Sequence, residues 1–179
     1  VSDPSVTVPY QPLLEWLEFL LRVCDPAALA ARAGEHGDAL VRLLPAFASV
    51  VEGDVPAQHA ETPTDRYLLQ SSVADFLRRV GELRPLLLVA EDIHWADGET
   101  LLLLARLARA APEGRLVIVA TFRQPGEEIG RELADLLASL SRLDGIRRIA
   151  LDNLSADEVG AFVREATEAD ATAELFARA

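Results

Sequence analysis

Two adjacent carboxylates, Glu91 and Asp92, directly follow a short apolar run. A second apolar run, residues 115–122, includes Thr121 and leads into Arg123. Short continuous apolar runs of this kind are typical of strands that are buried on both faces. Ligands of open parallel sheets bind at the carboxyl ends of the strands. The sequence therefore predicts a polar patch of two carboxylates, a hydroxyl and a guanidinium at one edge of an apolar sheet.

Hydrolysis of a nucleoside triphosphate is the chemistry that uses this set of side chains. One acid at a strand end holds Mg²⁺, directly or through water, and a second acid orients or deprotonates the attacking water. A cation on the neighbouring strand neutralises the terminal phosphate. We therefore expect Glu91 and Asp92 to be catalytic and to bind Mg²⁺, and Arg123 with Thr121 to contact the nucleotide.

A plainer interpretation of the same residues stays open. Glu91 and Asp92 would then be solvated acids in an ordinary turn between a strand and a helix, and Arg123 would be a surface ion-pairing residue. In the same turn, we expect His94 to be a hydrogen-bonded turn residue and Trp95 to pack beneath the turn. No second His or Cys stands at metal-ligand spacing, which argues against a zinc site.

The region from residue 85 to residue 167 alternates between apolar runs and amphipathic stretches. Strands are predicted at 86–90, 115–122 and, more weakly, 146–151, and helices at 98–111, at about 127–142 and from Ser155 onward. Asp97 is expected to cap the 98–111 helix, and Ser155 with Glu158 forms a capping box. This alternation predicts a parallel sheet with right-handed crossovers.

The preceding region, residues 1–84, is predicted to be mainly helical. Helices are expected at 10–24, 25–34, 37–51 (broken near Pro45) and 62–81, with a loop at 52–61. Thr62 and Asp65 form a capping box for the last of these helices, and Gly81 suits its end. We expect one α/β domain, in which a helical region (residues 1–84) precedes an α/β region (residues 85–179).

Composition and charge narrow the class of protein. Half of the residues are hydrophobic, which fits a soluble globular chain, and no apolar run is long enough to cross a bilayer. The net charge of −12 argues against direct contact with nucleic acid, which needs a basic patch. The single cysteine, Cys24, cannot form an internal disulfide and indicates a reducing, cytoplasmic setting.

Three segments carry a resemblance to a known family. The string "LLLVAEDIHWADGETLLLL", then "RLVIVATFRQ" and then "LDNLSADEVGAFV", resembles the ATPase module of the large LuxR-type transcriptional regulators. These modules are AAA-like, signal-transducing P-loop ATPases. "VPYQPLLEWL" and "TDRYLLQSSVADFLRR" resemble the helical stretches that precede the acidic strand in that family. The resemblance covers most of the chain in the right order, and it implies a partial P-loop NTPase fold.

The resemblance also implies a role for each residue of the polar patch. Glu91 and Asp92 match the Walker B pair, and Arg123 with Thr121 matches the sensor position. The family often has two aspartates, so Glu91 is a variation. Its extra methylene moves the carboxylate outward, so we expect its contact with Mg²⁺ to run through water.

The family also has a phosphate-binding loop, G-x-x-x-x-G-K-[ST], whose backbone N–H groups cradle the phosphates and whose lysine neutralises them. All 17 positively charged residues of this chain are arginine, so no such loop is present. Methionine is also absent, and we expect the sequence to be an internal segment of a longer protein, with the loop upstream of Val1. In the family fold, the strand that leads into the loop would pair with the 115–122 strand. That strand would therefore have one unpaired edge here.

The function implied by the resemblance is a regulatory switch in a cytoplasmic, multidomain bacterial regulator. The module would bind and hydrolyse ATP with Mg²⁺, and by itself this chain would bind ATP weakly or not at all. Its partners would be the nucleotide and other domains of the same polypeptide, including a C-terminal helix-turn-helix, but not a membrane. The alternative is a degenerate, non-hydrolysing scaffold for protein–protein contact. The retained acid pair and Arg123 count against that alternative.

Overall fold

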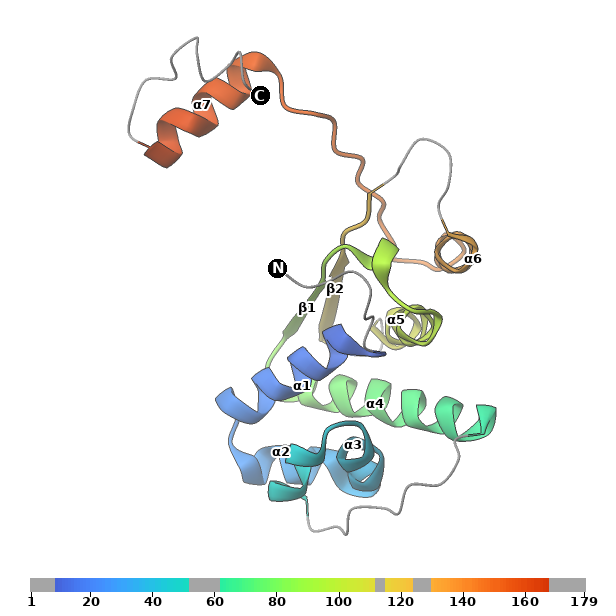
Figure 1. Ribbon diagram of the computed structural model, residues 1–179. Helices are drawn as coiled ribbons and strands as arrows, with labels where there is room; N and C mark the ends of the chain where they lie inside the picture. Colours follow the sequence, from blue (N-terminus) through green and yellow to red (C-terminus); the bar gives the residue numbers. More distant parts are fainter. Residues whose placement is uncertain (1–8, 52–61, 112–114, 124–129, 168–179) are drawn as a thin grey trace. The chain divides into compact units, whose positions relative to one another are not determined.

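A computed structural model of the chain describes residues 9–51, 62–111, 115–123 and 130–167. The chain divides into two compact units, residues 1–146 and 147–179. The described helices and strands of the first unit are α1 (Gln11–Val23), α2 (Pro26–Ala33), α3 (Gly37–Leu43), α4 (Pro63–Leu83), β1 (Leu86–Ala90), α5 (Gly98–Ala110), β2 (Leu116–Ala120) and α6 (Arg131–Leu140) (Figure 1). Short 3-10 helices lie at η1 (Gly34–His36), η2 (Pro45–Ser49) and η3 (Ile93–Trp95), and the second unit contains α7 (Ala156–Thr167).

Local signals in the sequence set the ends of the first helices. Asp25 caps α2 by accepting a hydrogen bond from a backbone N–H of the first turn, and Gly34 ends this helix in the left-handed region with φ 48°. Thr62 and Asp65 form the predicted capping box of α4. The predicted break near Pro45 is confirmed, because α3 ends before this proline and η2 begins at it.

Helix α4 carries the centre of the main hydrophobic core. Its predicted apolar face is buried, at Leu69, Val73, Phe76, Leu77 and Val80. Phe76 meets Phe47 edge-on, with the ring centroids 5.5 Å apart. The prediction that Gly81 ends this helix is wrong, since α4 continues to Leu83. Gly81 instead permits a close approach, because a Cβ there would lie 3.2 Å from the carbonyl oxygen of Arg115, just before β2.

Strands β1 and β2 form a two-stranded parallel sheet, in which Leu86 pairs with Leu116 and Ala90 with Ala120. One face of the sheet is buried against helices, through Leu88, Ala90 and Leu116. The other face is exposed, at Leu87, Val89, Val117 and Val119. Alternate side chains of a strand point to opposite faces, and the described helices cover only one of them. The expectation that both strands are buried on both faces is therefore wrong for the described structure.

The predicted third strand at 146–151 is also wrong. The described sheet consists of β1 and β2, and both Ile149 and Leu151 are largely exposed. A strand requires a neighbour that exchanges backbone hydrogen bonds with it, and apolar side chains alone do not supply one. In the second unit, α7 follows the predicted capping box, where Oε2 of Glu158 accepts from the backbone N–H of Ser155 at 2.8 Å.

Helix α6 covers a portion of the helix predicted at 127–142, and residues 124–129 lie outside the described structure, as does the predicted loop at 52–61. None of the described helices combines the length and the apolar character that crossing a membrane requires. Helices with a small parallel sheet make the described chain an α/β arrangement. The division into a helical region (residues 1–84) and an α/β region (residues 85–179) stays a prediction.

Candidate functional site at the ends of the two strands

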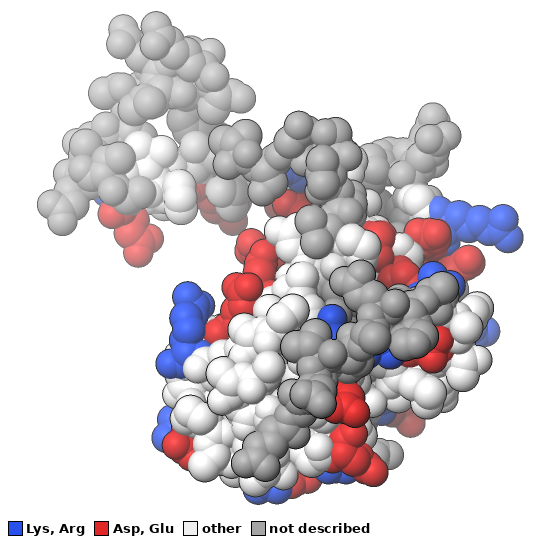
Figure 2. Space-filling model, turned by 60° about the horizontal axis from the view of Figure 1, so that its bottom comes forward, with Lys and Arg blue, Asp and Glu red and all other residues white. Residues whose placement is uncertain are grey.

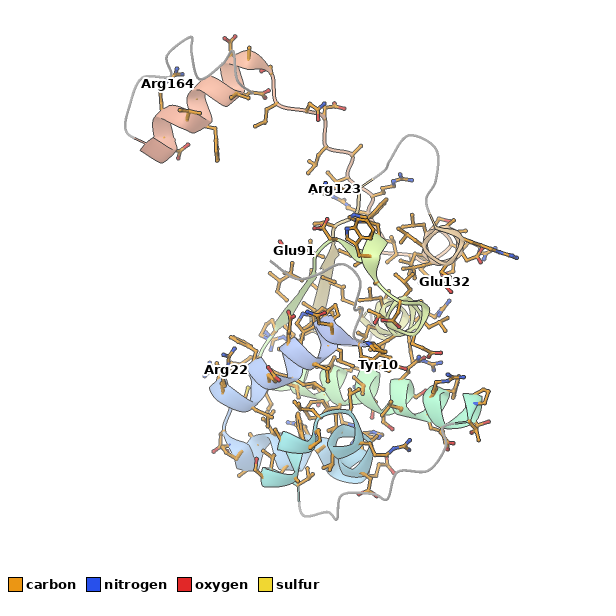
Figure 3. All side chains as sticks on the ribbon, viewed as in Figure 1. Tyr10, Arg22, Glu91, Arg123, Glu132 and Arg164 are labelled. Atoms are coloured by element: carbon orange, nitrogen blue, oxygen red, sulfur yellow. The ribbon has the colours of Figure 1, made fainter. Side chains whose placement is uncertain are left out.

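The structure brings the four predicted site residues together at the carboxyl edge of the sheet. Figure 3 shows Glu91 and Arg123 at the same end of β1 and β2. The backbone N–H of Thr121 donates to the carbonyl of Ala90 at 2.9 Å, which extends the pairing of the strands by one residue. Because the strands are parallel and in register, the acid pair and the Thr121–Arg123 segment leave the sheet side by side.

Thr121 holds the turn that begins with the two acids, residues 91–97 (the acid turn), in place through its side chain and its backbone. Its hydroxyl oxygen accepts a hydrogen bond from the backbone N–H of Asp92 at 3.0 Å. Its carbonyl oxygen accepts another from the backbone N–H of Ile93 at 2.9 Å. These contacts give Thr121 a role that its sequence position did not reveal, because they fix the backbone on which Asp92 stands.

Asp92 occupies a backbone conformation that few residue types adopt. Its φ of 52° and ψ of 42° place it in the left-handed region, where Asp and Asn are tolerated better than other residues with a Cβ. This conformation turns the chain sharply after β1. The carboxylate remains 54% exposed, and Glu91 beside it is exposed as well. Both acids can therefore reach a ligand from solvent.

Arg123 lies close to Asp92 without forming a tight ion pair. Its Nε is 3.9 Å from Oδ1 of Asp92, and its side chain is 81% exposed. An exposed pair at this distance contributes little to stability. The guanidinium is therefore available to bind an anion at the strand ends, which suits a residue that contacts phosphate.

His94 joins the two sides of the site, a contact that the sequence did not indicate. Its Nδ1 accepts a hydrogen bond from the backbone N–H of Arg123 at 3.4 Å and lies 3.7 Å from Oδ1 of Asp92. The side chain is only 12% exposed. The expectation of a hydrogen-bonded turn residue is confirmed. Its partner, however, lies on the other strand end, which no local pattern in the sequence predicts.

Trp95 does not pack beneath the turn as expected. Its side chain is 69% exposed, with its ring 5.0 Å from that of His94. The buried anchor of the turn is instead Ile93, which belongs to an apolar cluster beneath the site. The other buried members of that cluster come from β1, α5 and α6: Ala90, Leu101, Leu104, Ala105, Leu133 and Leu136. An apolar floor of this kind fixes the turn and leaves its polar side chains at the surface.

The far end of the turn is fixed by the start of α5. Asp97 is the predicted N-cap, and its Oδ1 accepts from the backbone N–H of Thr100 at 3.0 Å. Its Oδ2 accepts from the hydroxyl of Thr100 at 2.5 Å. The turn from Glu91 to Asp97 is therefore held at one end by Thr121 and at the other by the first turn of α5.

The donor set of the site fits Mg²⁺ only with help from a ligand. Among the described residues, no three His, Cys, Asp or Glu side chains come together as a metal-binding group. Mg²⁺ is commonly held by one or two carboxylates, with substrate phosphates and water completing the shell. The exposed carboxylates of Glu91 and Asp92 match that pattern, and they do not form an all-protein cage.

Comparison with known proteins gave one match. A family model described as AAA ATPase domain matches residues 2–119, which is more than half of the chain. Glu91 and Asp92 lie within the matched residues, whereas Thr121 and Arg123 follow them. No curated protein and no solved structure matches the chain. The chain belongs to the AAA ATPase domain family.

Proposed function

We propose that this chain is the acidic half of an ATP-hydrolysing module, in which Asp92 and Glu91 bind Mg²⁺ and activate water. The observation that carries the proposal is the position of the two exposed carboxylates beside Arg123 at the carboxyl edge of a parallel sheet. Bound Mg²⁺ supplies positive charge where the terminal phosphate gains negative charge. Arg123 adds a second positive charge from the neighbouring strand, and Thr121 keeps Asp92 in register with it.

The division of labour between the two acids follows from their positions. The backbone of Asp92 is fixed by Thr121, and His94 and Arg123 lie close to its carboxylate. A fixed carboxylate suits the Mg²⁺ ligand. Glu91 is exposed and has a longer side chain, which suits orientation of a water molecule or water-mediated contact with the metal.

A phosphate-binding loop must complete the site, and we propose that residues outside this chain supply it. The chain contains no lysine, and the P-loop lysine is the residue that neutralises the β- and γ-phosphates. The intact protein would be a cytoplasmic LuxR-type regulator, in which ATP binding and slow hydrolysis control a DNA-binding output domain. This segment would not itself contact DNA. Its net charge is −12, and on the face in Figure 2 arginine side chains lie among acidic ones and do not gather in one patch.

A scaffold that only contacts other proteins is the second candidate. The exposed apolar face of the sheet favours it, at Leu87, Val89, Val117 and Val119. Large apolar side chains gathered on one face are typical of protein contact surfaces. A scaffold has no use for two carboxylates and a guanidinium at the strand ends, so loss of those charges would leave its binding unchanged.

Steady-state ATP turnover separates the two candidates. The assay needs the protein that joins this chain to a phosphate-binding loop, here called the loop-containing protein. Glu91→Gln and Asp92→Asn keep the shape of each side chain and remove its charge. We expect each to lower kcat by roughly a hundredfold or more, because each removes a group that acts in the transition state. Glu18→Gln, at an exposed position of α1, is the matched control. Equal turnover in all four proteins would support the scaffold.

A further inference from the structure

We propose that Tyr10 is a positioning residue that holds the acid turn from its far end, through Thr100 and Asp97. Tyr10 precedes α1 and lies 90 positions before Thr100 in the sequence. In the structure its backbone N–H donates to the hydroxyl oxygen of Thr100 at 2.9 Å, and this contact is buried. Figure 3 shows Tyr10 beside α4 and α5, at the start of α1.

The backbone of Tyr10 is held in a conformation that an aromatic residue seldom adopts. Its φ is 62° and its ψ is 19°, in the left-handed region, and the residue is buried. Such a conformation persists only where the surrounding contacts determine it. The contact that it makes possible is the hydrogen bond from its N–H to Thr100, which points away from α1 and into the first turn of α5.

The phenol of Tyr10 joins the same turn of α5 to α4. Its hydroxyl donates to Oε2 of Glu99 at 3.2 Å, and Nε2 of the buried Gln70 donates to that oxygen at 2.9 Å. Gln70 also donates to the Tyr10 hydroxyl oxygen at 3.3 Å. On the outer side, Nε of Arg66 lies 3.6 Å from the other carboxylate oxygen of Glu99. The bonds to Glu99 are part-buried, and a polar network in which each member has a partner makes the structure around it more rigid.

Thr100 passes this constraint to the acid turn. Its hydroxyl accepts from Tyr10 and donates to Oδ2 of Asp97, so both functions of the hydroxyl are used. Asp97 is the N-cap of α5 and the last residue of the turn that begins at Glu91. Thr121 holds the other end of that turn. Tyr10 therefore helps to hold the end of the turn opposite to the acids, which stand at the end that Thr121 holds.

We expect the fold of the first unit to survive the loss of the phenol. Helix α1 is anchored by its own buried leucines, Leu13, Leu17 and Leu20, in the main core. Tyr10→Phe keeps the ring and the backbone N–H and removes the bonds to Glu99 and Gln70. Thr100→Val removes the hydroxyl that links Tyr10 to Asp97 at nearly constant volume, whereas Thr100→Ser retains it. Thr100→Val therefore breaks the link itself, whereas Tyr10→Phe removes only the support that the phenol gives to the first turn of α5.

Amide hydrogen exchange on the 179-residue chain tests the link directly. For Tyr10→Phe and Thr100→Val, we expect the rate of amide exchange at residues 93–101 to rise roughly five- to tenfold. The exchange rates in α2, α3 and α4 should stay unchanged. Thr100→Ser and Tyr67→Phe, which changes the exposed tyrosine of α4, should match the wild type. No change at 93–101 would overturn the proposal. A uniform rise across all helices would also overturn it, because it would show that Tyr10 serves only global stability.

The effect on catalysis rests on the proposed function and is measured separately. In the loop-containing protein, Thr100→Val should lower kcat for ATP several-fold and leave KM unchanged, because it breaks the link to the acid turn and leaves the phosphate-binding groups in place, whereas Thr100→Ser should match the wild type. A several-fold rise in KM with an unchanged kcat would overturn the positioning role. If the wild type shows no Mg²⁺-dependent turnover, the proposed function fails, and the exchange experiment still decides whether Tyr10 holds the acid turn.

Discussion

The backbone N–H of Arg123 donates a hydrogen bond to Nδ1 of His94 over 3.4 Å, which ties the end of β2 to the turn that follows β1. The same nitrogen lies 3.7 Å from Oδ1 of Asp92. His94 therefore stands within 4 Å of both the acid and the backbone of the cation. Its largely buried ring sets how far apart these two charges stand.

Two substitutions of His94 test this role. Asn places an acceptor oxygen near the position of Nδ1, whereas Leu fills similar space without an acceptor. We expect His94→Leu to lower kcat of the loop-containing protein roughly five- to tenfold, which corresponds to the loss of one hydrogen bond of about 1 kcal/mol. His94→Asn should stay within about twofold of the wild type. If both variants lose the same activity, the hydrogen bond to Nδ1 is not the cause, because the loss would then come from removal of the imidazole ring.

Neighbouring leucines of β1 test which face of the sheet is covered. Leu88 is buried in the main core, and Leu87 is exposed on the opposite face. Leu88→Ala should lower the free energy of unfolding by about 2–4 kcal/mol, and Leu87→Ala by less than about 1 kcal/mol. Urea unfolding of the two variants and the wild type gives both values. Similar large losses in the two variants would show that a further segment covers the outer face.

The lowered pKa of Asp75 on α4 makes the free energy of unfolding depend on pH in the acid range. Burial alone would raise the pKa of its carboxyl, but hydrogen bonds from Arg78 and His36 and the charges of Arg79 and Arg78 outweigh burial and lower the pKa. Nε2 of His36 and Nη2 of Arg79 both lie 2.7 Å from Oδ2 of Asp75. Because the folded-state pKa lies below the unfolded one, the ionised carboxylate stabilises the fold above the unfolded pKa of about 3.9. That stabilisation disappears as the pH falls through the lowered pKa.

The matched variant for this prediction is Asp75→Asn, which cannot ionise. At pH 7 we expect the wild type to exceed it in the free energy of unfolding by roughly 1 kcal/mol, given that the site is partly exposed. Urea unfolding between pH 7 and pH 3 should show the two proteins converging at the acid end. A constant difference across that range would mean that Asp75 acts through shape and not through charge.

Signals that act within a few residues were readable from the sequence. The caps at Asp25, Thr62, Asp97 and Ser155 and the break at Pro45 were predicted because each depends on one side chain and the adjacent backbone. The gathering of the acid pair with Thr121 and Arg123 was also predicted. It follows from one general property of parallel strands, that their carboxyl ends share an edge.

Features that depend on a contact with a residue far along the chain could not be predicted from the sequence. Residues 146–151 have strand-like composition but form no strand in the described structure. Gly81 was predicted to end α4, yet it serves a contact with Arg115. The hydrogen bond from Tyr10 to Thr100 joins residues 90 positions apart. In each case the deciding contact comes from tertiary structure, which local propensity does not encode.

The binding of Mg²⁺-ATP by the loop-containing protein and its Asp92→Asn variant is the most direct test of the central claim. Isothermal titration would be run with Mg²⁺ and again with EDTA, and Glu18→Gln would serve as the control. The account predicts that Mg²⁺ tightens ATP binding by the wild type and the control. For Asp92→Asn, the factor by which Mg²⁺ tightens ATP binding should be smaller by roughly tenfold or more. Asp92→Asn with the full Mg²⁺ dependence of the wild type would contradict the account, because Asp92 would then not hold the metal.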